Sequence, residues 1–99
     1  EQIIPKHLIS PDANLIVAAA VPNGSTVAYG SGFNSNENYI IAIILNPNTT
    51  KILGSGTSNN SGAFKLESTI DLGTGIYTVI AEGKQGSSAS APLLVSLDK

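Results

Sequence analysis

The chain has 99 residues, of which 41% are hydrophobic and 12% are charged, with a formal net charge of −2 and no Arg, Cys, Met or Trp. A length near 100 residues indicates one domain with one core. Five Lys without Arg argue against a nucleic-acid surface, because phosphate binding needs clustered basic side chains. A single His and no Cys argue against most metal sites, so we expect no cofactor.

The first segment, Glu1–Pro11, is apolar and is bracketed by Pro5 and Pro11. It is expected to be a linker or a strand added at one sheet edge, with the folded domain at 12–99. Because the chain begins with Glu rather than Met, it was either processed or excised from a longer protein, and of these two we expect excision. The longest apolar run, Tyr39–Leu45, has seven residues. A membrane-spanning helix needs about 20, so we expect no membrane insertion.

Short segments rich in Ile, Val, Thr, Tyr and Phe alternate with turns rich in Asn, Gly, Ser and Pro. No segment keeps a 3.6-residue period, so the pattern predicts an all-β antiparallel sandwich of about seven strands. The expected strands are Leu15–Val21, Thr26–Ser31, Tyr39–Leu45, Lys51–Gly54, Ala63–Ile70, Ile76–Glu82 and Pro92–Leu97. The first of these segments contains three consecutive Ala. Because Ala has weak strand propensity, a helix remains an alternative for that segment.

Alternation predicts which side chains face water. In Ala63–Ile70, Phe64 lies on an apolar face opposite a polar one. The segments at 39–45, 76–82 and 92–97 are aliphatic on both faces, so their outer face exposes aliphatic side chains if they are neighbours. We expect this interface at Ile41, Ile43, Ile76, Ile80 and Leu94. We expect such a face to be covered, either within the chain by Glu1–Pro11 or a loop, or by another chain or the next repeat.

Four pieces of sequence carry a family resemblance. They are Gly30-Ser31-Gly32-Phe33 followed by Glu37, Ser61-Gly62-Ala63-Phe64, Gly75 to Gly83, and Gly86 to Ala91. In this order they resemble immunoglobulin-like repeat modules of bacterial and archaeal extracellular surface proteins, over roughly Asn23 to Leu97. Ser35-Asn36 departs from the Pro-Gly that usually precedes the Glu. The resemblance implies an immunoglobulin-like sandwich with Greek-key connections and a non-catalytic extracellular module.

Several residues are expected to be structural. Tyr77 follows Gly75 by two residues at the start of a strand, the place of a tyrosine corner, whose hydroxyl bonds to nearby backbone. Val79 stands where antibody domains have a Cys, so packing replaces the disulfide. We expect Phe33 and Phe64 to be structural as well.

Catalytic and metal sites have little support. The run Asn34-Ser35-Asn36-Glu37-Asn38 faintly resembles a calcium loop, but it has one carboxylate and no following Gly, so a hydrogen-bonded turn is the main interpretation. No two acids show the pairing that glycoside hydrolysis needs, and no Ser lies in a nucleophile elbow. We therefore expect no enzyme.

The leading functional hypothesis is a structural, adhesion or assembly module of a larger surface-exposed protein. Its partner would be protein: a second copy, a neighbouring domain or another surface protein. One alternative is a virion module, as a decoration or tail-appended domain. Another is a carbohydrate-binding module, for which exposed aromatic side chains are needed. Tyr29 and Tyr77 are expected to be buried, which leaves Tyr39.

Overall fold

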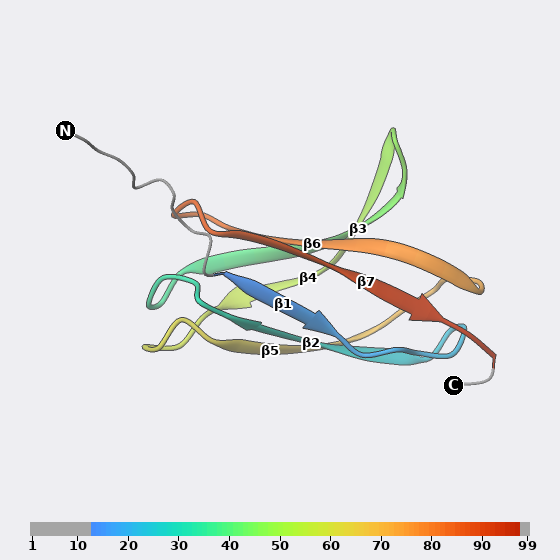
Figure 1. Cartoon of the computed structure of the whole chain (residues 1–99), viewed down its shortest axis with the longest axis horizontal. Helices are drawn as coiled ribbons and strands as arrows, with labels where there is room; N and C mark the ends of the chain where they lie inside the picture. Colours follow the sequence, from blue (N-terminus) through green and yellow to red (C-terminus); the bar gives the residue numbers. More distant parts are fainter. Residues whose placement is uncertain (1–12, 98–99) are drawn as a thin grey trace.

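The computed structural model describes residues 13–97, so the expected linker or edge strand at Glu1–Pro11, with His7, lies outside the described residues. Residues 13–97 form seven strands and no helix (Figure 1). The strands are β1 (Asn14–Val17), β2 (Ser25–Ser31), β3 (Asn38–Asn46), β4 (Thr49–Thr57), β5 (Phe64–Thr69), β6 (Gly75–Gly83) and β7 (Ser88–Val95). This part of the chain therefore holds no helix that could cross a membrane.

The strands form two antiparallel sheets that pack face to face. One sheet has the order β1-β2-β5 and the other the order β4-β3-β6-β7. Consecutive strands change sheet between β2 and β3, between β4 and β5, and between β5 and β6, as in an immunoglobulin-like Greek-key sandwich. The prediction of an all-β sandwich of about seven strands is confirmed.

Some strand boundaries differ from the prediction. β4 runs from Thr49 to Thr57 and is longer than expected, because its small residues pair with β3 as its aliphatic ones do. β7 begins at Ser88 rather than Pro92, since the Ser-Ala alternation before Pro92 already pairs with β6. β1 ends at Val17, and the chain then pairs again at Ala20, which forms a parallel bridge with Val95 of the other sheet.

Hydrogen bonds between the sheets close both long sides of the sandwich. On one side the Ala20 N–H donates to Leu94 O at 3.0 Å, and the Ser96 N–H donates to Ala20 O at 2.9 Å. On the other side the Ser68 hydroxyl of β5 donates to Leu53 O of β4 at 3.0 Å. Leu53 lies at a register shift between β3 and β4 and packs against the core. These contacts hold the two sheets in one position relative to each other.

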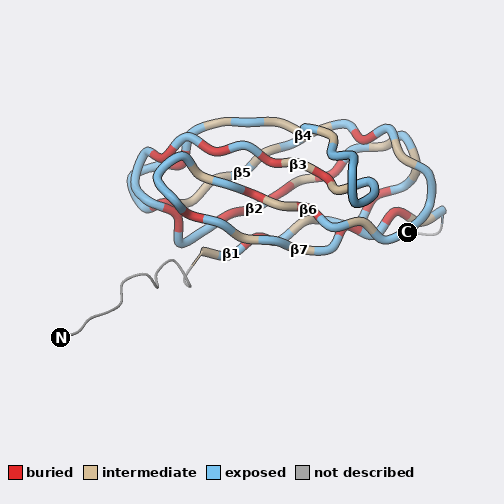
Figure 2. The backbone as a smooth tube through the Cα atoms, turned by 90° about the horizontal axis from the view of Figure 1, so that it is seen from above, coloured by how far each residue is buried: buried red, intermediate tan, exposed pale blue. Residues whose placement is uncertain are grey.

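The core lies between the sheets, where the inward residues of each strand are buried (Figure 2). In β3 these are Tyr39, Ile41 and Ile43, and in β6 they are Val79 and Ala81. Ile41 pairs with Ala81 and Ile43 with Val79. The expectation that Ile41 and Ile43 face outward is therefore wrong. Both faces of β3 are aliphatic, so alternation separates two sets of side chains without showing which set faces the core.

An aromatic cluster fills one end of the core. The ring of Tyr39 stacks on Phe64 with centroids 3.8 Å apart, and Phe33 meets Phe64 edge-on at 5.0 Å. Gly30 lies beneath the Phe64 ring, which occupies the place where a Cβ would stand. Tyr39 is buried at 3% exposure and Tyr29 is exposed at 47%, so the expectation for these two tyrosines is reversed. Burial also raises the pKa of the Tyr39 phenol.

Candidate functional site

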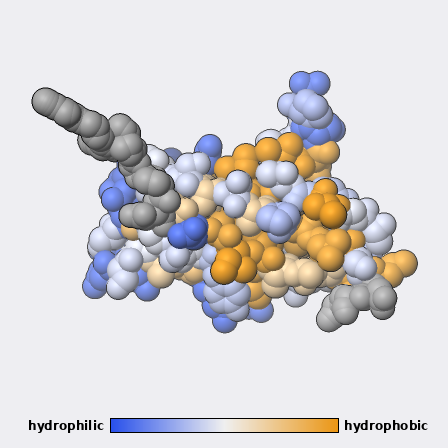
Figure 3. All heavy atoms as spheres, in the orientation of Figure 1, coloured by the Kyte–Doolittle hydropathy of each residue, from blue (hydrophilic) through white to orange (hydrophobic). Residues whose placement is uncertain are grey.

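The outer face of the four-stranded sheet is largely aliphatic. Ile76 is 76% exposed, Ile52 61% and Leu94 47%. We call this surface the apolar sheet face; it consists of Ile40, Ala42, Ile44, Ile52, Ile76, Ile80 and Leu94. Figure 3 shows hydrophobic surface at the base of the projecting β3–β4 hairpin, whose tip is hydrophilic, and further hydrophobic surface over the middle and right of the same view. The sheet therefore has an apolar exterior as well as an apolar interior.

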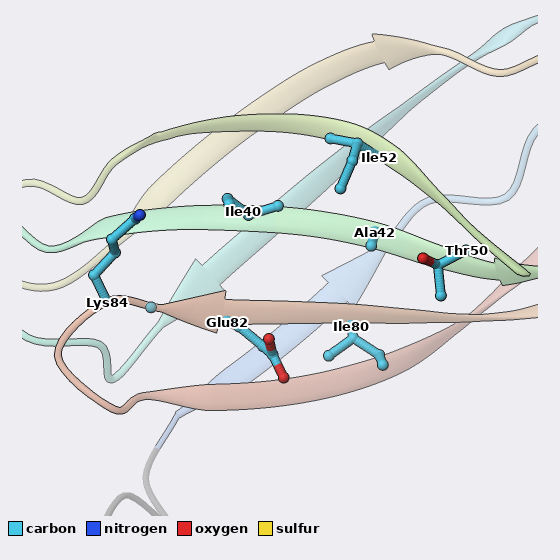
Figure 4. A pocket seen from close by; sticks show the side chains of 8 residues that line it. Ile40, Ala42, Thr50, Ile52, Ile80, Glu82 and Lys84 are labelled. Atoms are coloured by element: carbon cyan, nitrogen blue, oxygen red, sulfur yellow. The ribbon is translucent and has the colours of Figure 1, made fainter. Parts of the chain in front are cut away.

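A shallow groove of about 570 Å³ runs across the middle of this face (Figure 4). Its apolar lining comes from three adjacent strands: Ile52 of β4, Ile40 and Ala42 of β3, and Ile80 of β6. The strand register places Ala42 opposite Ile52 on one side and Ile80 on the other. The small side chain of Ala42 thus lies at the floor between two larger ones.

One acid and one base lie at the same end of the groove. Glu82 is in β6 and Lys84 follows the end of that strand. In Figure 4 the Glu82 side chain extends toward β7, whereas the Lys84 side chain extends across β3 in the direction of β4. The two charges therefore lie on opposite sides of the line between β3 and β6.

Three of the five predicted interface residues lie on this face. Ile76, Ile80 and Leu94 point outward, as expected from the alternation of β6 and β7. Ile41 and Ile43 do not, and their places are taken by Ile40, Ala42 and Ile44 of the same strand. The sequence showed an apolar outer face but did not assign the face of β3 correctly.

A second feature, which the sequence did not predict, is the buried carboxylate of Glu37. It accepts five hydrogen bonds from residues of two turns: Asn34 N–H at 2.8 Å, Asn34 Nδ2 at 3.3 Å, Gln85 N–H at 2.8 Å, Ser87 N–H at 3.3 Å and Ser87 Oγ at 2.7 Å. Burial raises the pKa of the Glu37 carboxyl, but these hydrogen bonds outweigh that effect and hold the pKa below its usual value.

The backbone of Glu37 also forms hydrogen bonds with the connection between β4 and β5. Its N–H donates to Ser58 Oγ at 2.8 Å, and its carbonyl accepts from Ser58 N–H at 2.9 Å. The carboxylate oxygens thus bind donors of the protein itself, which agrees with a hydrogen-bonded turn rather than a calcium loop. The sequence feature that could have indicated this buried carboxylate is a single acidic residue directly before an apolar strand, in a chain whose other turns are mostly uncharged and polar.

The other predicted structural residues lie in or at the core. The Tyr77 hydroxyl donates to Gly73 O at 2.9 Å, which is the hydrogen bond of a tyrosine corner. Gly75, between them, has a φ of +151°, a conformation that side chains rarely adopt. Val79 and Phe33 are buried, and Phe64 is half-buried beside Phe33.

No three His, Cys, Asp or Glu side chains within 13–97 lie close enough to share a metal ion. Asp71 lies 4.0 Å from Lys51 in an exposed ion pair, and Glu67 faces solvent on β5.

The comparisons with known proteins show the fold and no family. No protein-family model matches the chain, and no curated protein matches it. Among solved structures it is similar to a superoxide reductase (neelaredoxin) from Ignicoccus hospitalis, with a TM-score of 0.52. The two share 9% sequence identity over 84% of this chain and 78% of that chain. At this identity the likeness shows a shared β-sandwich architecture alone.

This likeness corrects one expectation. We expected no enzyme, partly because the resemblance implied a non-catalytic module. A chain of similar architecture is a superoxide reductase, which is an enzyme. The fold therefore does not support the exclusion of catalysis, and that expectation is wrong as it was drawn.

Proposed function

We propose that this chain is an immunoglobulin-like assembly or adhesion module of a larger surface-exposed protein, and that it docks protein through its apolar sheet face. The exposed aliphatic face of the four-stranded sheet carries this proposal. The exterior of β5, in the other sheet, instead presents Lys65, Glu67 and Thr69 to solvent. The exterior of the same sheet also exposes Ile16 and Tyr29 on β1 and β2, so its apolar surface is confined to two residues beside a polar strand.

The physical argument rests on the removal of aliphatic surface from water. Each Å² of apolar surface that is buried contributes about 25 cal/mol. An isoleucine such as Ile52 or Ile76 that points outward contributes little to folding, and a contiguous patch of such side chains favours association. A partner with a flat apolar surface would bury them together.

We also propose an extracellular location for the module. The abundance of uncharged polar residues and the resemblance described above support a cell-surface or other extracellular location. A virion decoration or tail-appended domain would use the same face in the same way. Carbohydrate binding is the weaker candidate, because the exposed aromatic Tyr29 lies on β2, away from the groove.

Site-specific photocrosslinking in the parent protein in its own cells or virions tests the docking role. A photoreactive amino acid replaces Ile80, and in a matched control it replaces Tyr29 on the opposite exterior. We expect a protein adduct from position 80 and none from position 29. Lys65, which is exposed, should also react with a membrane-impermeant amine reagent on intact particles. Equal adducts at both positions, or none at 80, would contradict the proposal.

A further inference from the structure

We infer that Glu1–Pro11 of this same chain lies across the apolar sheet face and covers its groove until a docking partner displaces it. We call Glu1–Pro11 the N-terminal segment. As regulation of the docking surface, this inference rests on the proposed function. Three observations carry it: the shape of the groove, the place where the chain enters the sandwich, and the two charges at one end of the groove.

The groove suits a narrow occupant. Its volume of about 570 Å³ lies within the range of about 300–1,000 Å³ that is typical of sites for small ligands. The β3–β4 hairpin projects outward at one end of the face (Figure 1), and its residue Thr50 is part of the groove lining (Figure 4). The occupant must therefore fit beside the hairpin, as an extended chain does. The floor at Ala42, between Ile52 and Ile80, leaves room for an aliphatic side chain.

The chain enters the sandwich close to this groove. The described residues begin at Ala13, which packs against the core, and β1 begins at the next residue. β1 lies beside β7 and runs in the same direction, as does the parallel bridge between Ala20 and Val95 (Figure 1). The start of β1 therefore lies at the same end of the sandwich as the turn between β6 and β7, which carries Lys84. The N-terminal segment thus joins the sandwich at the charged end of the groove.

The segment is long enough to reach the groove and to occupy it. The path from β1 to the outer face spans one sheet spacing of about 10 Å, and the path from β7 to the line between β3 and β6 spans fewer than two strand spacings of about 5 Å. Residues 1–12, extended at about 3.3 Å per residue, reach about 40 Å. About half of them therefore suffice for the path, and the other half can lie along the groove. This places Ile3 and Ile4 at its aliphatic lining.

The sequence of the segment favours an extended cover. Its aliphatic side chains are Ile3, Ile4, Leu8 and Ile9. Pro5 and Pro11 restrict the residue before each of them to extended conformations. Because proline has no N–H to donate to a neighbouring strand, the two prolines also disfavour a strand added at a sheet edge. An extended segment that lies on the face satisfies both conditions.

The charges at the entry end of the groove complement the segment. Within residues 13–97 the ion pair that forms joins Lys51 and Asp71, so Glu82 and Lys84 have no charged partner there. Glu82 extends toward β7 (Figure 4), which the segment must cross. Lys6 lies halfway along the segment and would pass Glu82 at this crossing. Lys6 can then pair with Glu82, while the two isoleucines before it reach the uncharged middle of the groove.

Introduced cysteines test the cover, because the chain has no Cys of its own. The full-length chain carries Ile4→Cys with Ala42→Cys at the groove floor, and the matched control carries Ile4→Cys with Tyr29→Cys on the opposite exterior. A disulfide needs two Cα atoms within about 7 Å, so mild oxidation should link the first pair within one monomer and leave the control reduced. Ile3→Cys is tested in the same way, because adjacent residues of an extended chain face opposite sides. If neither residue links to position 42, the inference is overturned.

A second measurement needs no cysteine. The full-length double variant Ile3→Asp with Ile4→Asp should detach the segment, because it places two charges against the aliphatic lining. Gln2→Asp with Ser10→Asp adds the same charge to the segment without removing an aliphatic side chain, and is the matched control. We expect the fluorescence of an added hydrophobic dye to rise in the first variant and to stay at the wild-type value in the control. Equal signals from the two variants would overturn the cover.

The outcomes separate this inference from the proposed function. With a photoreactive residue at position 80 of the parent protein, the Ile3→Asp and Ile4→Asp variant should give more partner adduct, because the segment no longer competes. Equal partner adduct without a disulfide at position 42 overturns the cover and leaves the docking role in place. A disulfide at position 42 without any partner adduct supports the cover and contradicts docking. A disulfide-linked dimer in place of the linked monomer shows that the segment comes from a second copy, which overturns cover by the same chain.

Discussion

The hydroxyl of Ser87 donates a hydrogen bond of 2.7 Å to the carboxylate of Glu37, which precedes it by 50 positions in the sequence. Glu37 lies in the connection before β3, and Ser87 lies in the turn between β6 and β7. The buried carboxylate thus fastens two turns to each other at one end of the sandwich. A charge in this position stabilises the fold only as long as all its acceptor positions are filled.

Replacement of Glu37 by Gln tests the importance of this junction. The side chain keeps its size, but an NH₂ group then faces donors that previously found an acceptor. Loss of buried hydrogen bonds to a charged group costs about 2–4 kcal/mol, so we expect a drop of that order in the free energy of unfolding. Glu67→Gln, on the exposed face of β5, should change it by less than about 0.5 kcal/mol. Urea denaturation of both variants measures the difference, and equal values would show that the junction is dispensable.

The same carboxylate predicts a pH dependence. Because the folded-state pKa of Glu37 is lower than the usual 4.5, the unfolded chain binds more protons between the two values. The contribution of Glu37 to stability is therefore fully present above about pH 5 and is lost as the pH falls through its folded-state pKa. Denaturation curves between about pH 2 and pH 7 should show this loss in the wild type. A Glu37→Gln variant with the same acid slope would contradict the assignment.

A pair of glycines probes the space around Glu37. A Cβ at Gly83 would overlap the Glu37 carboxylate, whereas a Cβ at Gly73 would meet no atom within 4 Å. Gly83→Ala must therefore displace a carboxylate that is held by five hydrogen bonds, and we expect a loss of about 2 kcal/mol or more. Gly73→Ala should be neutral or slightly stabilising, because Ala reduces the freedom of the unfolded chain. Thermal unfolding distinguishes the two, and similar melting temperatures would refute the proposed overlap.

The two faces of the four-stranded sheet should respond differently to truncation. Ile43 is 1% exposed and Ile76 is 76% exposed. Ile43→Ala leaves a cavity in the core and is expected to cost about 2–5 kcal/mol, whereas Ile76→Ala should cost less than about 1 kcal/mol. Measurement at concentrations where the chain is monomeric avoids a contribution from association. A larger loss at Ile76 than at Ile43 would reverse the assignment of the two faces.

The amino-acid sequence determined the class of fold and much of its local detail. Regularly spaced turns and period-two alternation predicted the strands, because a strand with one solvent-exposed face alternates polar and apolar residues. The same alternation placed Ile76, Ile80 and Leu94 outward. The spacing of Gly75 and Tyr77 indicated the tyrosine corner, which depends on residues close together in the chain.

Tertiary structure alone decided three other features. β3 is aliphatic on both faces, so only packing against β6 and the aromatic cluster shows that Tyr39, Ile41 and Ile43 face inward. Tyr29 is exposed because the opposite face of β2 has small residues, and Gly30 there leaves room for Phe64. Two of the three residues that donate to the Glu37 carboxylate, Gln85 and Ser87, lie about 50 positions away. Local periodicity carries no information about such distant contacts, which arise when the sheets come together.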